Sequence, residues 1–178
     1  VSGSTDHTTL KTAIDACSLN GTLSGPGPFT LFAPTDAAFN LLPAGTLTAL
    51  LNDIPQLTNI LLHHVASDSV MSSMLINGQI ISTLLGSNIA VTINSNGVFI
   101  DNAQVIIADL VADNGVVHVI DAVLLPSFGC TDPNACNYDP SANTDDGSCL
   151  TNYGCTDSTA FNYDPTATCD DGSCITIV

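Results

Sequence analysis

The sequence predicts an α+β domain followed by a small disulfide-rich tail, and three observations support this class. Apolar residues at helical spacing dominate residues 7–64, whereas β-branched runs separated by turn residues dominate residues 79–126. Helices followed by strands are typical of α+β folds rather than of an alternating parallel sheet. Six of the seven cysteines fall in the last 50 of the 178 residues, which predicts a stapled, loop-dominated tail.

The first helix is predicted over residues 7–18, because its apolar residues fall on one side of a helix. That face carries Leu10, Ile14 and Cys17. Asp6 precedes it and is placed to cap its first turn. Residues 19–28, "LNGTLSGPGP", are rich in Gly and Pro and predict a loop.

A buried strand and three helices follow. The run "FTLFA" at 29–33 is apolar, aromatic and β-branched, as a buried strand requires. Thr35 or Asp36 caps a short helix that Pro43 ends. Two further helices are predicted over residues 46–52 and 56–64.

From residue 79 the pattern becomes that of a β-sheet. Turn sequences such as "GSN", "NSNG" and "DNG" separate most of the apolar runs. The predicted strands lie within residues 79–85, 88–94, 97–102, 103–111 and 116–126. The last of these is long and β-branched, as expected of a central strand.

Three segments carry a resemblance to fasciclin-like domains. "FTLFAPTDAAF" at 29–39 and "NGVVHVIDAVLLP" at 114–126 resemble the two signature segments of that family, and "LLHHV" at 61–65 resembles the motif between them. The resemblance covers about residues 5–126. His64 keeps the family's histidine, whereas His63 stands where the family usually has tyrosine.

The resemblance implies a compact β-wedge of two sheets with helices packed around it. It also implies a secreted or cell-surface adhesion module that is not an enzyme. Structural roles are expected for the motif residues Thr35, Asp36, His64, His118 and Asp121. Asp36 is expected to serve a helix end or to contact His64, and His118 to be buried or to face solvent from its strand. No nucleophile elbow, phosphate loop or H-E-x-x-H motif occurs in the sequence.

Charge excludes several classes of partner. The chain has 17 acidic residues, all aspartate, and one basic residue, Lys11, for a net charge of −16. Nucleic acid and anionic membrane surfaces are therefore excluded, because both require a cationic face. No apolar run is long enough for a membrane-spanning helix. The expected partners are other extracellular proteins or surface polymers, and divalent cations are the natural counter-charge.

The tail contains a tandem repeat. Residues 129–149 and 154–174 are identical at 15 of 21 positions, so we expect a first domain over 1–128 and repeats over 129–153 and 154–178. Each repeat is too short to bury a core and needs covalent or metal staples. A repeat of this kind is typical of a spacer, and the tail is similar to repeats of extracellular bacterial proteins.

Disulfide bonds are the expected staples. The tail cysteines are Cys130, Cys136, Cys149, Cys155, Cys169 and Cys174. Their first and last positions match in both repeats, so each repeat could close on itself and the remaining pair could join the two. Six cysteines allow 15 connectivities, and the sequence does not choose among them. Zinc is the rival, but paired C-x2-C knuckles and nearby histidines are absent from the tail.

Cys17 has two interpretations, a buried free thiol or a bridge to the tail. The cysteine density predicts an oxidising, extracellular location. The chain opens with polar "VSGSTDHTT" rather than with a signal peptide, as expected of a mature product.

The tail also predicts calcium binding. Two carboxylates forced to about 4–5 Å cost roughly 3–4 kcal/mol at an effective dielectric near 20, and a hard cation would remove that cost. The tail contains no basic residue that could do so. The alternative is that "DDG" is a turn and the charges are solvated. The predicted ligands are Asp132, Asn137, Asp139, Asn143, Asp145, Asp146, Asp157, Asn162, Asp164, Asp170 and Asp171.

The final segment Ile175, Thr176, Ile177 and Val178 is almost entirely apolar and β-branched. It could add as a strand to the next molecule and form a homo-oligomer or fibre. It could also pair within its own repeat or begin a further domain. The leading hypothesis remains a non-enzymatic extracellular adhesion or matrix module.

Overall fold

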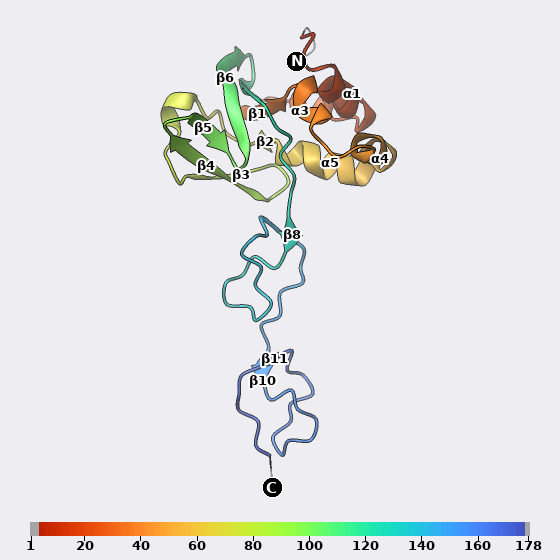
Figure 1. Cartoon of the computed structure of the whole chain (residues 1–178), viewed down its shortest axis with the longest axis vertical. Helices are drawn as coiled ribbons and strands as arrows, with labels where there is room; N and C mark the ends of the chain where they lie inside the picture. Colours follow the sequence, from red (N-terminus) through yellow and green to blue (C-terminus); the bar gives the residue numbers. More distant parts are fainter. Residues whose placement is uncertain (1–3, 177–178) are drawn as a thin grey trace. The chain divides into compact units, whose positions relative to one another are not determined.

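Two compact units make up the chain, Val1–Pro126 and Ser127–Val178. The computed structural model describes residues 4–176 (Figure 1). The sequence places the boundary two residues later, after residue 128. Ser127 belongs to the second unit because its backbone N–H donates to the carboxamide oxygen of Asn143 at 2.8 Å. None of the helices in the described range is long and apolar enough to cross a bilayer.

The helices of the first unit agree with the sequence prediction except near residue 20. They are α1 (Thr8–Ala16), α2 (Asn20–Leu23), α3 (Asp36–Asn40), α4 (Thr46–Asn52) and α5 (Ile54–His63), with the 3-10 turn η1 (Ser72–Met74). The segment predicted as loop therefore contains one helical turn, α2. That turn buries none of its residues, so its sequence carries no apolar stripe that could have predicted it.

Side chains cap two of these helices. Thr35 begins α3 by accepting a hydrogen bond from the N–H of Ala38 at 3.1 Å. Asp53 begins α5 in the same way, through Gln56 at 3.1 Å. The prediction that Asp6 caps α1 is wrong, since the N-cap is His7 and its side chain makes no capping bond.

Seven strands of the first unit form one continuous hydrogen-bonded order, β2-β1-β7-β6-β5-β4-β3. Their bounds are β1 (Phe29–Pro34), β2 (Val65–Ala66), β3 (Ile80–Ser82), β4 (Asn88–Asn94), β5 (Gly97–Ile100), β6 (Ala103–Ala112) and β7 (Gly115–Ile120). β1 and β7 are parallel and the other pairs are antiparallel. As predicted, β7 is central, because strands flank it on both sides, but it ends at Ile120 and the prediction of a strand through residue 126 is wrong.

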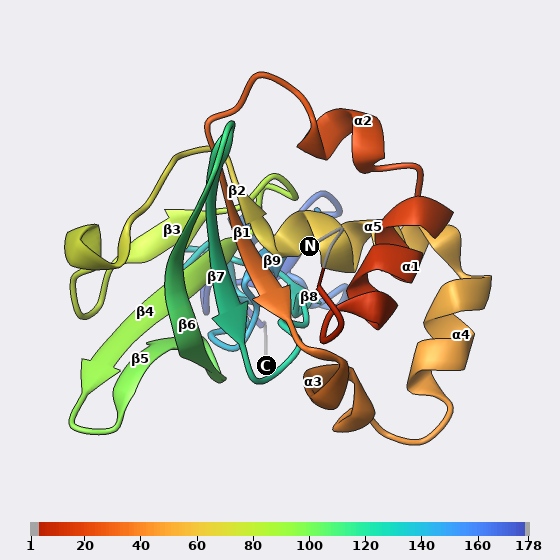
Figure 2. The same ribbon diagram turned by 90° about the horizontal axis from the view of Figure 1, so that it is seen from above.

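The strands that were expected to form two sheets are joined in one hydrogen-bonded sheet, because β6 is long enough to pair with both β5 and β7. Its first residues pair with β5 and its remainder with β7, across two register shifts between Val105 and Leu110. The order also curls, since Ala66 of β2 forms a bridge with Thr83, which follows β3 (Figure 2). The curled sheet encloses apolar side chains.

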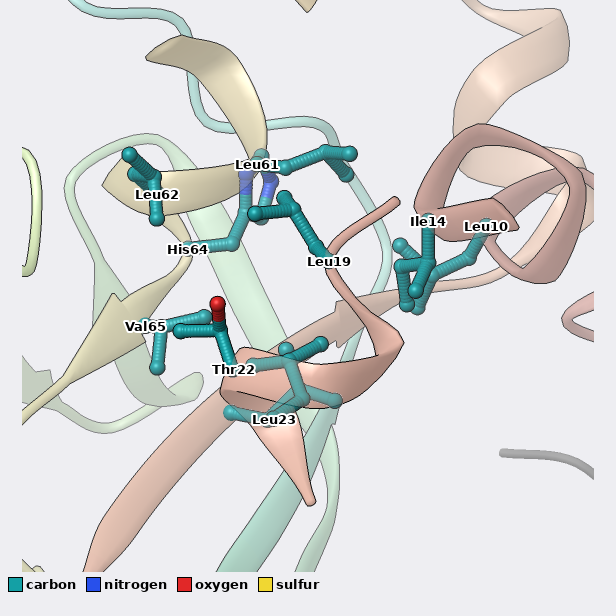
Figure 3. A pocket seen from close by; sticks show the side chains of 10 residues that line it. Leu10, Ile14, Leu19, Thr22, Leu23, Leu61, Leu62, His64 and Val65 are labelled. Atoms are coloured by element: carbon teal, nitrogen blue, oxygen red, sulfur yellow. The ribbon is translucent and has the colours of Figure 1, made fainter. Parts of the chain in front are cut away.

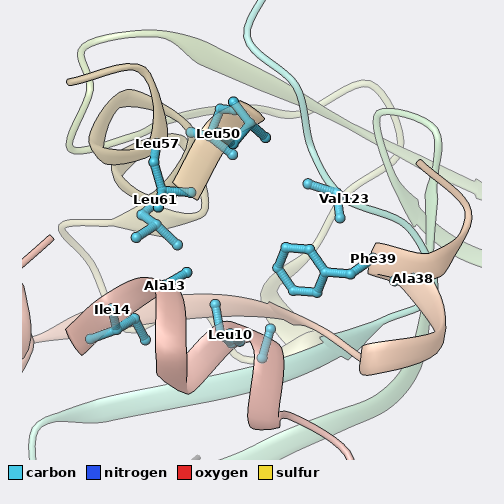
Figure 4. Close-up of a cluster of buried hydrophobic side chains, with 11 residues drawn as sticks. Leu10, Ala13, Ile14, Ala38, Phe39, Leu50, Leu57, Leu61 and Val123 are labelled. Carbon is cyan, nitrogen blue, oxygen red and sulfur yellow. The ribbon is translucent and has the colours of Figure 1, made fainter. Parts of the chain in front are cut away.

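Two apolar clusters lie on opposite sides of β1. Ala33 packs with the helices in the first cluster, which Figure 4 shows around Leu10, Phe39 and Leu61. Phe32 packs in the second, inside the curled sheet with Ile120 and other strand residues. Alternating side chains of a strand point to opposite faces, so one short strand serves both clusters.

The second unit repeats one backbone plan twice. In the first repeat, β8 (Phe128–Gly129) pairs in parallel with β9 (Thr144–Asp145). In the second, β10 (Tyr153–Gly154) pairs in parallel with β11 (Cys169–Asp170). The two strand pairs lie at matching positions of the two similar sequence segments.

Candidate functional site

Asp36 holds the beginning of α1 rather than that of its own helix. Its carboxylate accepts hydrogen bonds from the N–H of Thr9 at 2.7 Å, from the hydroxyl of Thr8 at 2.7 Å and from the N–H of Thr8 at 3.2 Å. The Thr9 bond, followed by those from Thr8, lowers the pKa of Asp36 to about 2. Both roles expected for Asp36 are therefore wrong: Thr35 caps the helix that Asp36 begins, His64 bonds to Ile60 and Leu124, and the Asp36 carboxylate serves α1 instead.

His64 has both ring nitrogens satisfied inside the protein. Nδ1–H donates to the carbonyl of Ile60 at 2.7 Å, and Nε2 accepts from the N–H of Leu124 at 3.0 Å. These partners fix the neutral tautomer, because a backbone carbonyl can only accept and an N–H can only donate. The pKa of His64 is lowered to about 4, mainly because burial disfavours the charged ring. The bond to Ile60 opposes this shift, and the neighbouring His63 contributes a smaller lowering.

His63 begins a buried hydrogen-bond chain. Its Nδ1 lies 2.5 Å from the hydroxyl of Ser87, which lies 2.7 Å from the hydroxyl of Thr83. The Thr83 hydroxyl also lies 3.1 Å from the Ser87 carbonyl, to which it can donate. The three side chains therefore form one buried hydrogen-bond chain between the end of α5 and the segment that joins β3 to β4.

The other nitrogen of His63 has no partner. Nε2 is buried and has no hydrogen-bond partner in the part of the chain that the structure describes. Burial lowers the pKa of His63 to about 4, which keeps the imidazole neutral near pH 7. His63 is the position at which the sequence departs from the motif that it resembles, so the unpartnered nitrogen lies at that departure.

His118 is fully buried, so the alternative that it faces solvent is wrong. Its Nδ1 accepts from the N–H of Asp109 at 3.3 Å, and its Nε2–H donates to the carbonyl of Val70 at 2.8 Å. Its ring stacks on Phe32 with centroids 5.7 Å apart. Asp121 accepts from the N–H of Gln104 at 2.7 Å and so fixes the pairing of β6 and β7.

Asp109 and Ser87 make hydrogen bonds that hold the fold together, but neither residue was identified from the sequence. Asp109 adopts a left-handed backbone with φ of 61° and accepts bonds from the N–H and hydroxyl of Ser72. An aspartate inside the run "QVIIADLVA" was the available signal, because aspartate is disfavoured in strands and tolerates that backbone.

A small apolar cavity of about 10 Å³ lies between α1, α2, α5 and β1, with His64 in its wall (Figure 3). That volume is about one water-sized probe, so the cavity is a packing gap rather than a ligand site.

Every aspartate of the second unit forms the same local turn. One oxygen, Oδ1, accepts a hydrogen bond from the backbone N–H two residues further on. These turns begin at Asp132, Asp139, Asp145, Asp146, Asp157, Asp164, Asp170 and Asp171. The hydroxyls and N–H groups of the turns hold the pKa below its ordinary value at Asp139, Asp146, Asp157, Asp164 and Asp171.

The three predicted asparagine ligands also bind backbone. The Asn137 carboxamide joins Ser148 and Leu150 at 2.8 Å each, and Asn162 repeats this with Ser173 and Ile175. Asn143 accepts from Ser127. Such bonds replace the apolar core that each repeat lacks.

The described residues do not form a calcium cluster. No group of three or more aspartate, histidine or cysteine side chains within residues 4–176 lies close enough together to hold a metal ion. The predicted ligands instead occupy separate turns, and the donor set does not fit a preformed site. Calcium binding by these loops stays a prediction.

The six tail cysteines form three disulfides in the structure. Cys130 pairs with Cys149 and Cys155 with Cys174, so each repeat is closed on itself. Cys136 pairs with Cys169 across the repeats. The hydroxyl of Tyr153 also crosses, donating to the carbonyl of Asn134 at 2.6 Å. One of the 15 open connectivities is thereby selected.

Cys17 is a free thiol, so the alternative bridge to the tail is not formed. It is only partly buried, in contrast to the buried thiol that the helical pattern predicted.

Ile175 is bound within its own repeat rather than presented as a free strand. Its N–H donates to Asn162 at 2.7 Å, and its carbonyl accepts from Phe161 at 2.9 Å. Neither Ile175 nor Thr176 lies in a strand. Ile177 and Val178 lie outside the described residues, so assembly through this segment stays a prediction.

Comparison with known proteins identifies the class. The Fasciclin domain family model matches residues 5–126, more than half of the chain. The chain therefore belongs to the fasciclin family. The match ends at the last residue of the first unit, and the second unit lies outside it.

Relatives agree with this assignment. The uncharacterized protein sll1735 of Synechocystis sp. is 47% identical over 117 residues, 66% of this chain and 87% of that protein. Transforming growth factor-beta-induced protein ig-h3 of Sus scrofa is 34% identical over 124 residues, 69% of this chain but 18% of that longer protein. A solved FAS1 domain pair from the insect cell adhesion molecule fasciclin I gives a TM-score of 0.48 at 23% identity, covering 71% of this chain and 50% of that one.

Proposed function

We propose that the protein is a non-enzymatic extracellular adhesion or matrix module, in which the tail is a stapled spacer for the fasciclin domain. Membership of the fasciclin family over residues 5–126 carries the proposal. Adhesion outside the cell is what the family resemblance implies.

The three disulfides support an extracellular location, because such bonds persist in oxidising compartments. A non-enzymatic role is supported by the histidines. Both ring nitrogens of His64 and of His118 are bound to backbone groups, and Nδ1 of His63 is hydrogen-bonded to the buried Ser87 hydroxyl. Each is thereby committed to the fold rather than to a substrate.

The spacer role is supported by covalent closure of each repeat and by the bridge between repeats. Closing a loop of 19 residues twice and one of 33 residues once removes much of the freedom of an otherwise coreless segment. Calcium stiffening would add to this and is a separate proposal. The alternative of a fibre joined by strand addition has no contact of the described residues in its favour.

The adhesion proposal is tested with beads coated with the full chain, applied to cells and extracellular material of the source. Matched beads carry the variant Phe32→Asp, which places a charge in a buried position and unfolds the first unit. We expect the native beads to adhere and the variant beads to be released by washing. Equal retention of the two bead types, or retention of neither, would contradict the proposal.

A further inference from the structure

A groove of about 330 Å³ opens on the first unit between α1, α2, β1 and the turn that joins β6 to β7. Figure 2 shows α1, α2, β1 and the turn between β6 and β7, with α2 at the upper right. Its rim is polar and consists of Lys11, Asn20, Ser24 and Asn114. This volume lies at the lower end of the range of roughly 300–1,000 Å³ for ligand pockets and suits one small polar molecule.

The groove has an apolar floor beneath that rim. Ile14, Leu23 and Leu31 line it, and Ile14 is buried against the helix cluster. A ligand with one apolar face and several hydroxyl groups would contact both kinds of surface.

The polar rim is already held in place by contacts within the protein. Asn114 donates from Nδ2 to the carbonyls of Leu23 at 2.7 Å and Gly25 at 3.0 Å. Asn20 donates to Asp15 at 2.8 Å, and Lys11 donates to the same carboxylate at 2.6 Å. A ligand would therefore meet ordered side chains, which lowers the entropic cost of binding.

Two glycines allow the wall of the groove to form. A Cβ atom on Gly27 would lie 2.2 Å from the carbonyl oxygen of Asn114, and one on Gly115 would lie 1.9 Å from that of Phe29. Only glycine permits the loop after α2 to lie against the β6–β7 turn at these points. The position of Asn114 over the groove depends on that approach.

The remaining hydrogen-bonding groups are of both kinds. In the bonds just described, Asn114 and Asn20 use only Nδ2, so their Oδ1 atoms are left as acceptors. Ser24 is exposed and offers a hydroxyl, and Lys11 has further N–H donors. Neighbouring hydroxyl groups of a sugar each donate and accept, so a mixed rim of amide, hydroxyl and ammonium groups matches them.

Charge disfavours an anionic ligand, and the residues that line the groove include no carboxylate that would pair with a cationic one. The chain has a net charge of −16, and Lys11, its one basic residue, is neutralised by Asp15. An anionic sugar would meet repulsion without a free cation to offset it, whereas an uncharged sugar loses nothing.

We propose that this groove binds a single uncharged sugar residue of an extracellular polysaccharide, with the hydroxyls on the polar rim and the C–H face on Ile14, Leu23 and Leu31. The inference rests on the proposed adhesion function, since it names the partner class of the same domain. Binding to one residue in an open groove is expected to be roughly millimolar, and a polymer would gain by offering many sites.

The test uses the full chain and two polymers with one backbone, dextran and the anionic dextran sulfate. Affinity electrophoresis gives retardation, and methyl glucoside titrated in NMR locates the site by amide shifts. The groove variant is Asn20→Ala with Ser24→Ala, both at exposed positions, and the matched control is Asn52→Ala at an exposed position of α4. Thermal melting of each variant verifies folding.

We expect dextran to retard the native chain and the control, and the groove variant to bind at least about fivefold more weakly, as the loss of one hydrogen bond implies. Shifts should centre on Lys11, Asn20, Ser24 and Asn114. Tighter binding to dextran sulfate than to dextran, equal binding by the groove variant, or no response to dextran and methyl glucoside would overturn the inference. Bead adhesion that is unchanged in the groove variant would also overturn it while leaving the adhesion proposal intact.

Discussion

The Nε2 atom of His64 accepts a hydrogen bond from the backbone N–H of Leu124 at 3.0 Å. This single contact joins the end of α5 to the segment after β7, 60 residues later in the chain. His64 lies three residues after Leu61, which belongs to the helix cluster, and Leu124 belongs to the sheet cluster. The bond therefore links the two segments that carry these clusters. A buried N–H whose acceptor is removed keeps its full desolvation cost.

Replacing His64 should therefore destabilise the first unit strongly. His64→Ala removes the acceptor of Leu124 and the donor to Ile60 and leaves a cavity, for a loss of roughly 2–4 kcal/mol. The control is His63→Phe, which removes one hydroxyl contact but also an orphan nitrogen and should cost less. Urea unfolding followed by circular dichroism measures both. Equal losses in the two variants would contradict the role given to His64.

Acid should destabilise the first unit well above the range in which its carboxylates titrate. Burial lowers the pKa of His64 from 6.5 to about 4, so the unfolded state binds the proton first. The stability contributed by the neutral ring is fully present above about pH 6.5 and falls as pH decreases toward 4, by up to about 3 kcal/mol. His63 acts in the same direction.

The measurement is the urea midpoint between pH 7.5 and 4. His63→Phe should reduce the slope, because one of the two imidazoles whose pKa burial lowers is no longer present. A midpoint that is constant across this range would show that the rings are not held neutral by burial.

Asp36→Asn should weaken the attachment of α1, and its effect should vanish in strong acid. The hydrogen bonds from Thr9 and Thr8 lower the pKa of Asp36 to about 2, from 3.8. The carboxylate therefore stabilises the fold above about pH 4, and this contribution is lost as pH falls through 2. We expect a melting temperature a few degrees lower at pH 7 and little difference near pH 2. Asp113→Asn, at an exposed position in the β6–β7 turn, is the control; a difference that persists at pH 2 would contradict the assignment.

The sequence predicted this fold well where periodicity and local caps decide the structure. The bounds of α4 and the cap by Thr35 follow from such short-range patterns. Asp36 could not be assigned to α1, because its partners Thr8 and Thr9 lie 28 and 27 residues away. The joining of two expected sheets depended on the register of β6, which no local pattern encodes.

In the tail, the cysteines that the repeats share suggested that each repeat could close on itself and that the remaining pair could join the two, but the sequence left all 15 connectivities open. The aspartates were harder to interpret. Carboxylates spaced along a loop have the same pattern whether they gather round a cation or each form a turn. The structure places Asp139 and Asp145 in separate turns, and backbone conformation rather than composition makes that difference.

Removing the bridge between repeats should loosen the tail without affecting the first unit. The pair Cys136→Ser and Cys169→Ser opens a loop of 33 residues, which corresponds to about 3–4 kcal/mol of lost constraint. Chymotrypsin should then cut at Tyr153, whose hydroxyl otherwise holds Asn134. The fasciclin domain should melt as in the native chain. Unchanged resistance of the tail to chymotrypsin would show that the bridge does not stiffen the spacer.

Calcium is the last prediction, and it concerns what the aspartate turns leave over. Each turn uses Oδ1, so Oδ2 takes part in none of the turns. The adjacent pairs Asp145–Asp146 and Asp170–Asp171 also concentrate negative charge, and the tail has no basic residue to offset it. The sequence therefore predicts calcium uptake near millimolar concentration, because removing the repulsion between neighbouring carboxylates favours the bound state. Calorimetric titration of the native chain should show heat that disappears with a chelator, and replacing the four aspartates by asparagine should weaken it. Hydrogen exchange should slow within residues 127–176 on addition of calcium and stay constant in the first unit. A flat titration at millimolar calcium would mean that the turns alone account for these residues.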